Sequence, residues 1–323
     1  SEYVPDGEAK RIWQRMGTTF GSDTNAQTTP TQTVYKLDLP SATDAGIDES
    51  LHILAGMVSK PNITPQALNA ERPAVLAEQR EAPGPQVRVI DALNATFFAG
   101  QPLADRSPIG HVAELEAATA ETVKAFHDRW YRPERALVVI AGDFDPAKLE
   151  LMVAKNFADW KGSGPNPADP DFGVPDPKQI TTKAVVEPGI PTRIEMAILR
   201  PWRYNDDTVL FNQKRLADST ALAVINRRLE TRARSGGSFI AAAVRLDDPS
   251  RSANGTFVTI LPVGSAWEPA LKDVRAVIAD AQASPPTRAE IERELAEERI
   301  AFKTLVDTYR AEAGSKEADD MVQ

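Results

Sequence analysis

Two glutamates seven residues apart, Glu71 and Glu78, lie in the stretch ERPAVLAEQRE at residues 71–81. Seven residues make two turns of an α-helix, so both carboxylates would share one helix face, about 20° out of line. The spacing alone leaves three interpretations open: a solvated surface, partners in salt bridges, or half of a metal site. A metal site would need further ligands from elsewhere in the sequence.

Other metal-binding side chains are scarce. The chain of 323 residues has no cysteine, which excludes disulfides, thiolate nucleophiles and cysteine-based zinc sites. Its three histidines are His52, His111 and His127. The segment HVAEL at 111–115 is a near miss for an inverted zinc motif, because Leu115 occupies the place of the second histidine. The sequence therefore contains no histidine pair with the spacing of a zinc motif that could join the glutamates in a metal site.

Composition narrows the class of protein. A net charge of -9 and a pI near 5.1 argue against a nucleic-acid partner, because nucleic-acid binders carry a basic surface. No apolar run approaches the roughly 20 residues that span a bilayer, and the first ten residues, SEYVPDGEAK, are not a signal peptide. With no targeting segment present, the bacterial periplasm and the cytoplasm both remain compatible with the sequence.

The two glutamates belong to a predicted helix over residues 64–81. Thr64 is typical of an N-cap, and Pro65 of the first helical position. Pro73 lies inside the helix, where it removes one backbone hydrogen bond, and it predicts a kink near 69–73.

Further elements follow from periodicity and turn residues. We expect a helix at 5–16, two strands or a hairpin within 20–40, an amphipathic helix at 44–61, and one or two helices within 107–131. The apolar run RALVVIAGDFD at 135–145 predicts a buried strand. Asp145 then predicts the N-cap of a helix that runs to about residue 160.

A Pro- and Gly-rich segment divides the chain. The stretch GSGPNPADPDFGVPDP contains five prolines, three glycines and almost no large apolar side chain, which is typical of a linker. The length of the chain also favours two domains. We therefore expect a first domain at 1–165, a linker at 166–180 and a second domain at 181–323.

The second part of the chain repeats the first. TRAEIERELAEERIAFK parallels TPQALNAERPAVLAEQR, and a shift of 223 residues aligns Thr287 with Thr64. Glu294 then matches Glu71, whereas Ala301 stands opposite Glu78. These patterns predict an α+β fold of two tandem homologous domains, each with a mixed or antiparallel sheet and helices packed on one face.

An ordered set of motifs resembles the pitrilysin/insulinase family of zinc peptidases, which includes mitochondrial processing peptidase. The set consists of VPDGEAKRIWQRMGTTFGSDTNAQTTPTQTVYKLDLP, ERPAVLAEQRE, SPIG and WYRPERALVVIAGDFDP. The resemblance covers nearly the whole chain, and the internal repeat agrees with the tandem domains of that family.

The resemblance implies roles for named residues. In such peptidases two histidines of an H-x-x-E-H helix and a glutamate roughly 75 residues later hold the zinc, and the motif's own glutamate is the general base. Carried over, Glu78 is the third zinc ligand and Glu71 a supporting carboxylate behind it. The segment with Asp23, Thr24, Asn25 and Ala26 resembles the edge strand on which a peptide substrate lies by β-augmentation.

The resemblance also implies what this chain lacks. The H-x-x-E-H motif would precede its first residue, and the second, non-catalytic domain would be truncated at its C-terminus. We therefore expect a fragment of a zinc-dependent metalloendopeptidase that binds no zinc and is inactive on its own. Expected partners are a peptide or small protein substrate and either the rest of the parent chain or a homologous subunit that closes a chamber. The alternative is a non-catalytic partner subunit, or a peptide-binding or structural homologue.

Overall fold

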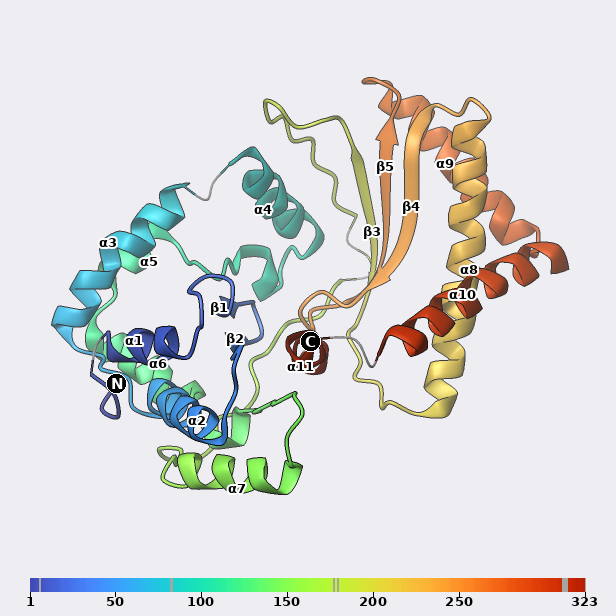
Figure 1. Ribbon diagram of the computed structural model, residues 1–323. Coiled ribbons are helices and arrows are strands. Elements are labelled where there is room, and N and C mark those ends of the chain that lie inside the picture. The colour runs from blue at the N-terminus through green and yellow to red at the C-terminus, as the bar shows by residue number, and fades with distance from the viewer. Residues whose placement is uncertain (6, 82–83, 177, 179, 310–312, 323) are drawn as a thin grey trace. The chain divides into compact units, whose positions relative to one another are not determined.

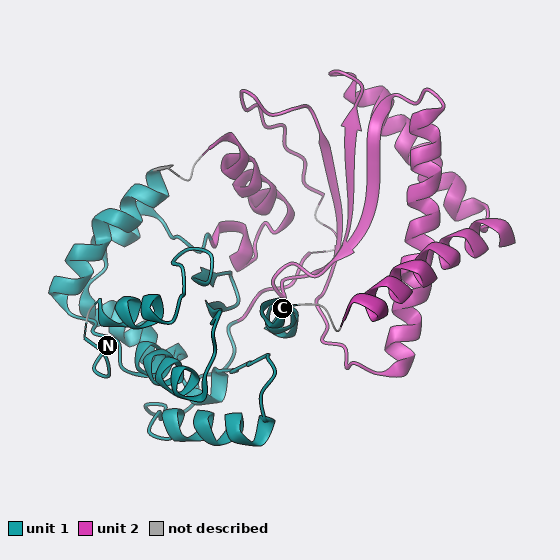
Figure 2. Cartoon of the chain, viewed as in Figure 1, with its two compact units in different colours: residues 1–82, 107–170, 311–323 teal, residues 83–106, 171–310 magenta. Residues whose placement is uncertain are grey.

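The structure is a computed structural model that describes residues 1–5, 7–81, 84–176, 178, 180–309 and 313–322. The chain forms two compact units, which Figure 2 distinguishes by colour. Unit 1 consists of residues 1–82, 107–170 and 311–323, and unit 2 of residues 83–106 and 171–310. The domain limits expected from sequence, 1–165 and 181–323, stay a prediction, and residues 177 and 179 of the expected linker lie outside the described residues.

Unit 1 is mainly helical around one short hairpin (Figure 1). Its elements are α1 (Glu8–Arg15), β1 (Thr24–Thr28), β2 (Thr33–Leu37), α2 (Asp44–Ser59), α3 (Pro65–Glu81), α5 (Val112–Ala117), α6 (Ala120–Trp130), the 3-10 turn η2 (Pro133–Arg135), α7 (Pro146–Phe157) and α11 (Gly314–Val322). The predicted N-cap of α7 is confirmed, because the Asp145 carboxylate accepts the Ala147 N–H at 3.0 Å.

The core of unit 1 joins α1 to α2. Ile12, Trp13 and Ile53 are buried together, and the Trp13 indole N–H donates to the Ser50 hydroxyl at 3.2 Å. A buried indole that keeps a hydrogen-bond partner contributes apolar area without leaving its polar N–H unsatisfied. The helix expected at 44–61 is confirmed as α2, and its Ile53 packs against α1.

The expected buried strand at 135–145 is wrong. Residues 137–141 form no strand, and the Leu137 side chain is 73% exposed. The apolar run invites a strand assignment, but a strand needs a neighbour to bond with its backbone. Among the described residues of unit 1 the only sheet is the β1–β2 pair, and it gives residues 137–141 no hydrogen-bonded partner.

The Pro- and Gly-rich segment starts as a fixed structure rather than a free coil. The guanidinium of Arg132, 2% exposed, donates to the carbonyls of Ser163 at 2.6 Å and Gly164 at 2.8 Å. Arg135 donates to the Asn166 side chain at 2.9 Å and pairs with Asp169. These charge-assisted bonds tie the beginning of the segment to the residues that follow α6.

Unit 2 is built on an antiparallel three-stranded sheet in the order β3-β5-β4. Its elements are α4 (Pro85–Phe97), the 3-10 turn η1 (Pro102–Asp105), β3 (Ile194–Arg200), α8 (Val209–Arg234), β4 (Phe239–Asp247), β5 (Asn254–Pro262), α9 (Trp267–Ala283) and α10 (Arg288–Thr308). Side chains alternate between the two faces of the central strand β5, so each face has its own apolar cluster.

One face of this sheet carries the helices of the second repeat. The buried cluster on this face consists of Leu229, Phe239, Val244, Val258, Ile260, Ala270 and Val274, contributed by α8, β4, β5 and α9. On the other face Phe257 packs with Phe98 and Leu103, which belong to the α4–η1 segment. The predicted α+β class with antiparallel sheets is confirmed. No helix in the described part of the chain is long and apolar enough to span a membrane.

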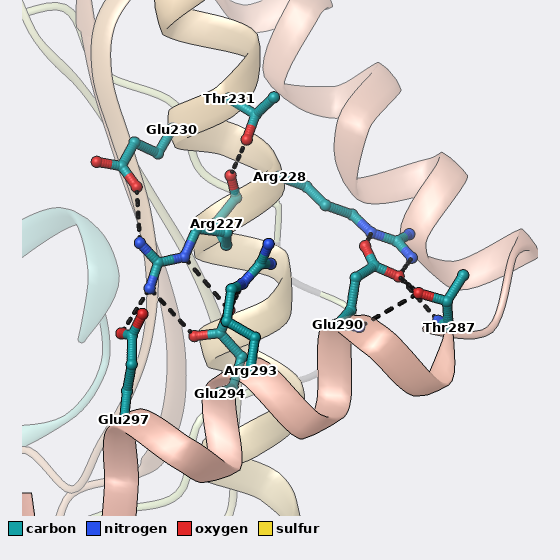
Figure 3. Close-up of polar contacts among 9 residues, drawn as sticks. All are labelled: Arg227, Arg228, Glu230, Thr231, Thr287, Glu290, Arg293, Glu294 and Glu297. Atoms are coloured by element: carbon teal, nitrogen blue, oxygen red, sulfur yellow. Dashed lines mark hydrogen bonds and ion pairs between the residues drawn. The ribbon is translucent and has the colours of Figure 1, made fainter. Parts of the chain in front are cut away.

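A set of ion pairs fastens α10 to α8 (Figure 3). Arg228 of α8 donates to both oxygens of Glu290 at 2.8 and 3.0 Å, and the Glu290 carboxylate also accepts the Thr287 N–H at 2.8 Å. Thr287 and Glu290 complete a capping box at the start of α10. These partners, Arg228 first, lower the pKa of Glu290 to about 2.

The depressed pKa of Glu290 predicts a component of acid sensitivity. The folded-state pKa lies below the ordinary glutamate value of about 4.3, so the unfolded chain takes up the proton first as the pH falls. The stabilisation by Glu290 is fully present above that ordinary value and is lost as the pH falls toward about 2. We expect Glu290→Gln to flatten the decline of the urea midpoint over this window, as followed by circular dichroism.

Glu292→Gln is the matched control, because Glu292 lies on the same helix and its one ion pair in the described structure is with the exposed Arg288. It should keep the wild-type pH profile. An unchanged profile in Glu290→Gln would contradict the assignment.

Candidate functional site

Helix α3 presents Glu71 and Glu78. Its start agrees with the sequence, because the Thr64 hydroxyl accepts the Ala67 N–H at 3.1 Å and Pro65 is the first helical residue. Pro73 lies inside the helix, which continues to residue 81. The two glutamates are thus carried by one helix, as their spacing predicts, and the kink near 69–73 stays a prediction.

Both carboxylates are exposed. Among the described residues, neither Glu71 nor Glu78 makes a hydrogen bond or ion pair with another side chain or with the backbone. The described part of the chain also contains no group of three His, Cys, Asp or Glu side chains that could hold a metal ion. Of the three interpretations open from spacing, the salt-bridge one finds no support in this geometry.

The histidines have other neighbours. The Nε2 atom of His127 lies 2.9 Å from the Val58 carbonyl, and its ring stacks on Tyr131 with 4.8 Å between centroids. The His52 ring stacks on Tyr3 at 4.9 Å. His111 immediately precedes α5. His127 and His52 are thus engaged in packing contacts within unit 1, and none of the three joins the glutamates in a metal-binding group.

Arg72, which sequence reasoning missed, fixes the position of α3. Its guanidinium donates to three backbone carbonyls at the end of α5, those of Leu115, Glu116 at 3.1 Å and Ala118 at 2.6 Å. A cation at a helix C-terminus satisfies carbonyls that the helix itself leaves unpaired. The cue in the sequence is an arginine beside Glu71 on a helix rich in small residues, but its target, 43–46 residues away, is not visible there.

The predicted substrate segment is an edge strand. β1 pairs with β2 alone among the described strands, from Thr24 opposite Leu37 to Thr28 opposite Thr33. Two bonds of this hairpin, Asp38 N–H to Asp23 O and Thr29 N–H to Gln32 O, show that the backbone groups of residues 23 and 29 point toward β2. In an antiparallel pair such residues alternate along the strand with residues whose backbone groups point outward.

The outward-facing backbone therefore belongs to Thr24, Ala26 and Thr28. The Thr24 carbonyl already accepts the Gly21 N–H at 3.2 Å. The Ala26 N–H donates only to the Asn25 side chain next to it, at 2.8 Å. The Ala26 carbonyl and the N–H and carbonyl of Thr28 have no partner in the described structure. This is an edge to which another extended chain can bond.

Asp23 shapes the turn that leads into this edge. Its carboxylate accepts the Thr19 N–H at 2.7 Å and the Ser22 hydroxyl at 3.0 Å. The bond from the Thr19 backbone, followed by that from Ser22, lowers the pKa of Asp23. Asp23 is thus a turn-forming residue in this geometry, and the substrate role of residues 23–26 stays a prediction.

Glu294, the repeat counterpart of Glu71, has very different surroundings (Figure 3). It is 3% exposed and lies 3.3 Å from Arg227 of α8 and 3.0 Å from Arg293. Burial raises the pKa of Glu294, but the bonds from these two arginines outweigh it and the net shift is downward. Ala301, opposite Glu78, is exposed and has no polar side chain. Of the two helices that the repeat aligns, α3 alone has a carboxylate at both positions, and both of its carboxylates are exposed.

Two family descriptions match the chain. Residues 2–107 match the description "Insulinase (Peptidase family M16)", and residues 117–297 match "Peptidase M16 inactive domain". Together they cover almost the entire sequence, and the second alone covers more than half of it.

One plant relative is similar over most of this chain. It is 29% identical over 239 residues to a "Zinc protease PQQL-like" from Arabidopsis thaliana, a match that spans 73% of this chain but 25% of the plant protein. This chain therefore spans about a quarter of that relative.

Solved structures share the fold. The first half of the periplasmic protease PqqL from Escherichia coli superposes with a TM-score of 0.78 at 17% identity, over 99% of this chain and 69% of that one. The ferredoxin protease FusC, solved with Arabidopsis ferredoxin, superposes with a TM-score of 0.68 at 18% identity, over 97% of this chain and 37% of that one. At such identities the likeness establishes the fold alone.

The Arg72 contacts predict that this residue holds α3 on α5. Arg72→Ala removes a charged donor from three carbonyls, and we expect a loss of about 1.5–3 kcal/mol in the free energy of unfolding. Hydrogen exchange should also accelerate selectively in residues 112–118. Urea denaturation measures the free energy of unfolding, and hydrogen exchange with mass-spectrometric detection measures the exchange rates.

Arg80→Ala is the control, because it removes an exposed arginine from the same helix. Its effect should stay within about 0.5 kcal/mol. Equal losses in the free energy of unfolding for the two substitutions would contradict the anchoring role of Arg72.

Proposed function

The chain belongs to the insulinase family of peptidases, family M16, and we propose that it supplies two parts of a zinc-dependent peptide-hydrolysing site. The first part is the carboxylate of Glu78, as one zinc ligand, with Glu71 as a supporting carboxylate. The second part is the outer edge of β1, as the strand to which a peptide substrate bonds.

One observation carries this proposal: a single compact unit holds both an accessible carboxylate pair and an open strand edge. Exposed acidic side chains are common by themselves. A strand edge with free backbone groups is normally blunted in a soluble protein. Their occurrence together in unit 1, and the loss of the Glu78 counterpart in the repeat, favour a function for this pair.

The residues of this chain alone do not fit a catalytic zinc ion. Such a site takes three protein ligands and a water molecule, and no three His, Cys, Asp or Glu side chains of the described residues come together to supply that set. We therefore propose that the two histidine ligands and the general base come from polypeptide outside this sequence, either the rest of a longer chain or a partner subunit. We assign no catalytic step to the present residues.

The role of this chain toward a peptide follows from its backbone. An extended substrate beside β1 would accept from the Thr28 N–H and donate to the Ala26 and Thr28 carbonyls. The Ala26 N–H becomes available when the Asn25 side chain turns away. Such bonds recognise the backbone of the substrate rather than its side chains, which is suited to peptides and small proteins of varied sequence.

Compartment and partners form part of the same proposal. The E. coli neighbour is a periplasmic protease, and FusC was solved with ferredoxin as its protein partner. A periplasmic setting and a small protein substrate are therefore the candidates for this chain, which cell fractionation and substrate trapping would test.

A second candidate is a non-catalytic role in which the same edge binds peptides that are never cut. The match of residues 117–297 to the inactive-domain description favours it. The two candidates make the same prediction for peptide binding but differ once the missing ligands are supplied.

The incomplete donor set predicts that the purified 323-residue chain retains less than one tenth of an equivalent of zinc after dialysis. We also expect no chelator-sensitive cleavage of a quenched peptide library, because the general base is absent as well. Metal content is measured by plasma mass spectrometry and turnover by fluorescence. Stoichiometric zinc that disappears in Glu78→Gln would overturn this expectation and indicate that other residues of the chain complete the site.

The open edge of β1 predicts where a peptide binds. Ala26→Pro removes an outward N–H and places a ring at the edge without removing a bond between β1 and β2. We expect at least about tenfold weaker binding of a fluorescent extended peptide, measured by polarisation. Ala26→Val, which keeps the N–H and suits a strand, is the control and should bind as the wild type does. Equal binding by both variants would rule out the β1 edge.

A further inference from the structure

The second repeat has its own exposed strand edge, at β4. The sheet order β3-β5-β4 leaves one side of β4 without a neighbouring strand in the described structure. β4 is the counterpart of β1, because each is the first strand of the hairpin that follows a helix and a glycine in its repeat. The strand spans nine residues, and Ile240 and Leu246 on it are 68% and 48% exposed. A long edge with apolar side chains is prone to pair with another chain.

A side chain from α8 occupies the middle of this edge. The Asn226 amide donates from Nδ2 to the Val244 carbonyl at 3.0 Å, and its Oδ1 accepts the Val244 N–H at 2.8 Å. Both polar groups of one strand residue are thus satisfied by one side chain. This is the same exchange of two bonds that a residue of a neighbouring antiparallel strand would make.

The register of the sheet agrees with this assignment. Val244 lies opposite Val258 of β5, and its N–H and carbonyl are both used by Asn226, so they point away from β5. By alternation the outward-facing neighbours are Ala242 and Leu246. Their outward groups have no partner in the described structure. Asn226 therefore interrupts a free edge at its centre, and Figure 1 shows α8 running beside β4.

We propose that Asn226 acts as a one-residue substitute for a neighbouring strand, and that it prevents β4 from pairing with the β4 strand of a second copy of this chain. Antiparallel pairing of two β4 edges about Val244 would place Ala242 opposite Leu246 of the other copy. Such an isologous contact is self-complementary. Small residues at 241–243 would leave the approaching backbone unobstructed. With the Asn226 amide in place, both the N–H and the carbonyl of Val244 are already bonded.

The edges of β1 and β4 differ in how their central outward residue is held. At β1 the central outward N–H, that of Ala26, is held by the side chain of the adjacent Asn25, on the same strand. At β4 the central residue is held at two points by a helix that is itself packed into the core of unit 2. A local side chain can rotate away, whereas Asn226 is fixed by the burial of its neighbours Val224 and Leu229.

Asn226→Ala tests the proposal, with Asn212→Ala as the matched control. Asn212 is on the same helix, but it is exposed and bonds to Asp207 rather than to β4. In samples dilute enough for the variant to stay monomeric, we expect the exchange rate of the Val244 amide, relative to that of the inward-bonded Ala243 amide, to rise at least about tenfold in Asn226→Ala only. Nuclear magnetic resonance gives both rates in one molecule, which removes the effect of overall stability.

The same variant should associate. We expect the weight-average mass of Asn226→Ala to rise toward a dimer at concentrations where wild type and Asn212→Ala show no such increase, measured by sedimentation equilibrium. Adding Leu246→Pro, which removes an outward N–H but no bond to β5, should abolish the association. An unchanged Val244 rate in the dilute monomer, or an open Val244 amide there without association at higher concentrations, would overturn the proposal.

Asn226→Leu covers the case in which the alanine variant does not fold. The leucine side chain has a shape similar to that of asparagine but can neither accept the Val244 N–H nor donate to its carbonyl. The variant should associate more than Asn212→Leu, which places the same apolar side chain elsewhere on the helix. Equal association of the two leucine variants would overturn the proposal as well.

Discussion

The backbone groups at the edge of a sheet need partners, and this constraint determines what each part of the chain can do. Edge N–H and carbonyl groups are either bonded within the protein, solvated, or available to another chain. At β1 the groups of Ala26 and Thr28 remain accessible, whereas at β4 the central residue is occupied by Asn226. The apolar segment 137–141 has no neighbouring strand in the described structure and forms no strand itself, and its Leu137 and Val138 side chains are exposed. The same requirement thus separates a candidate binding strand from a closed one.

The two repeats also treat equivalent carboxylates differently, and charge explains why. Glu294 is buried, which would be unfavourable for an isolated anion, and two arginines compensate. Glu71 is exposed and has no cationic partner in the described structure, so water solvates it. A carboxylate neutralised by arginine is a structural element, since its oxygens are already committed. An exposed, unpaired carboxylate keeps its lone pairs available to a cation, and α3 carries two of these.

The helix starts, the placement of the two glutamates and the fold class could be predicted from the sequence, because the signals for them are local. Thr64 and Pro65 mark the start of α3, Asp145 marks that of α7, and the spacing of Glu71 and Glu78 places them on one helix. The α+β class and the family follow from ordered motifs. The failures concern partners distant in sequence. The backbone groups that Arg72 and Asn226 bond lie in other elements, 46 and 18 residues away for Ala118 and Val244. The apolar run at 135–145 has the composition of a strand, but it has no neighbouring strand to pair with in the described structure.

The contacts of Arg72 show how one polypeptide segment can prepare part of a metal site that other segments complete. Arg72 directly follows Glu71 in sequence, and an arginine beside a glutamate can pair with it, as Arg293 does with Glu294 on α10. It instead donates to the carbonyls at the end of α5, so it positions the helix and leaves the carboxylates unneutralised. Rigid placement and a free anionic face are what one segment can contribute in advance to a metal site that others complete. A helix anchored through its own carboxylates would have lost the second property in gaining the first.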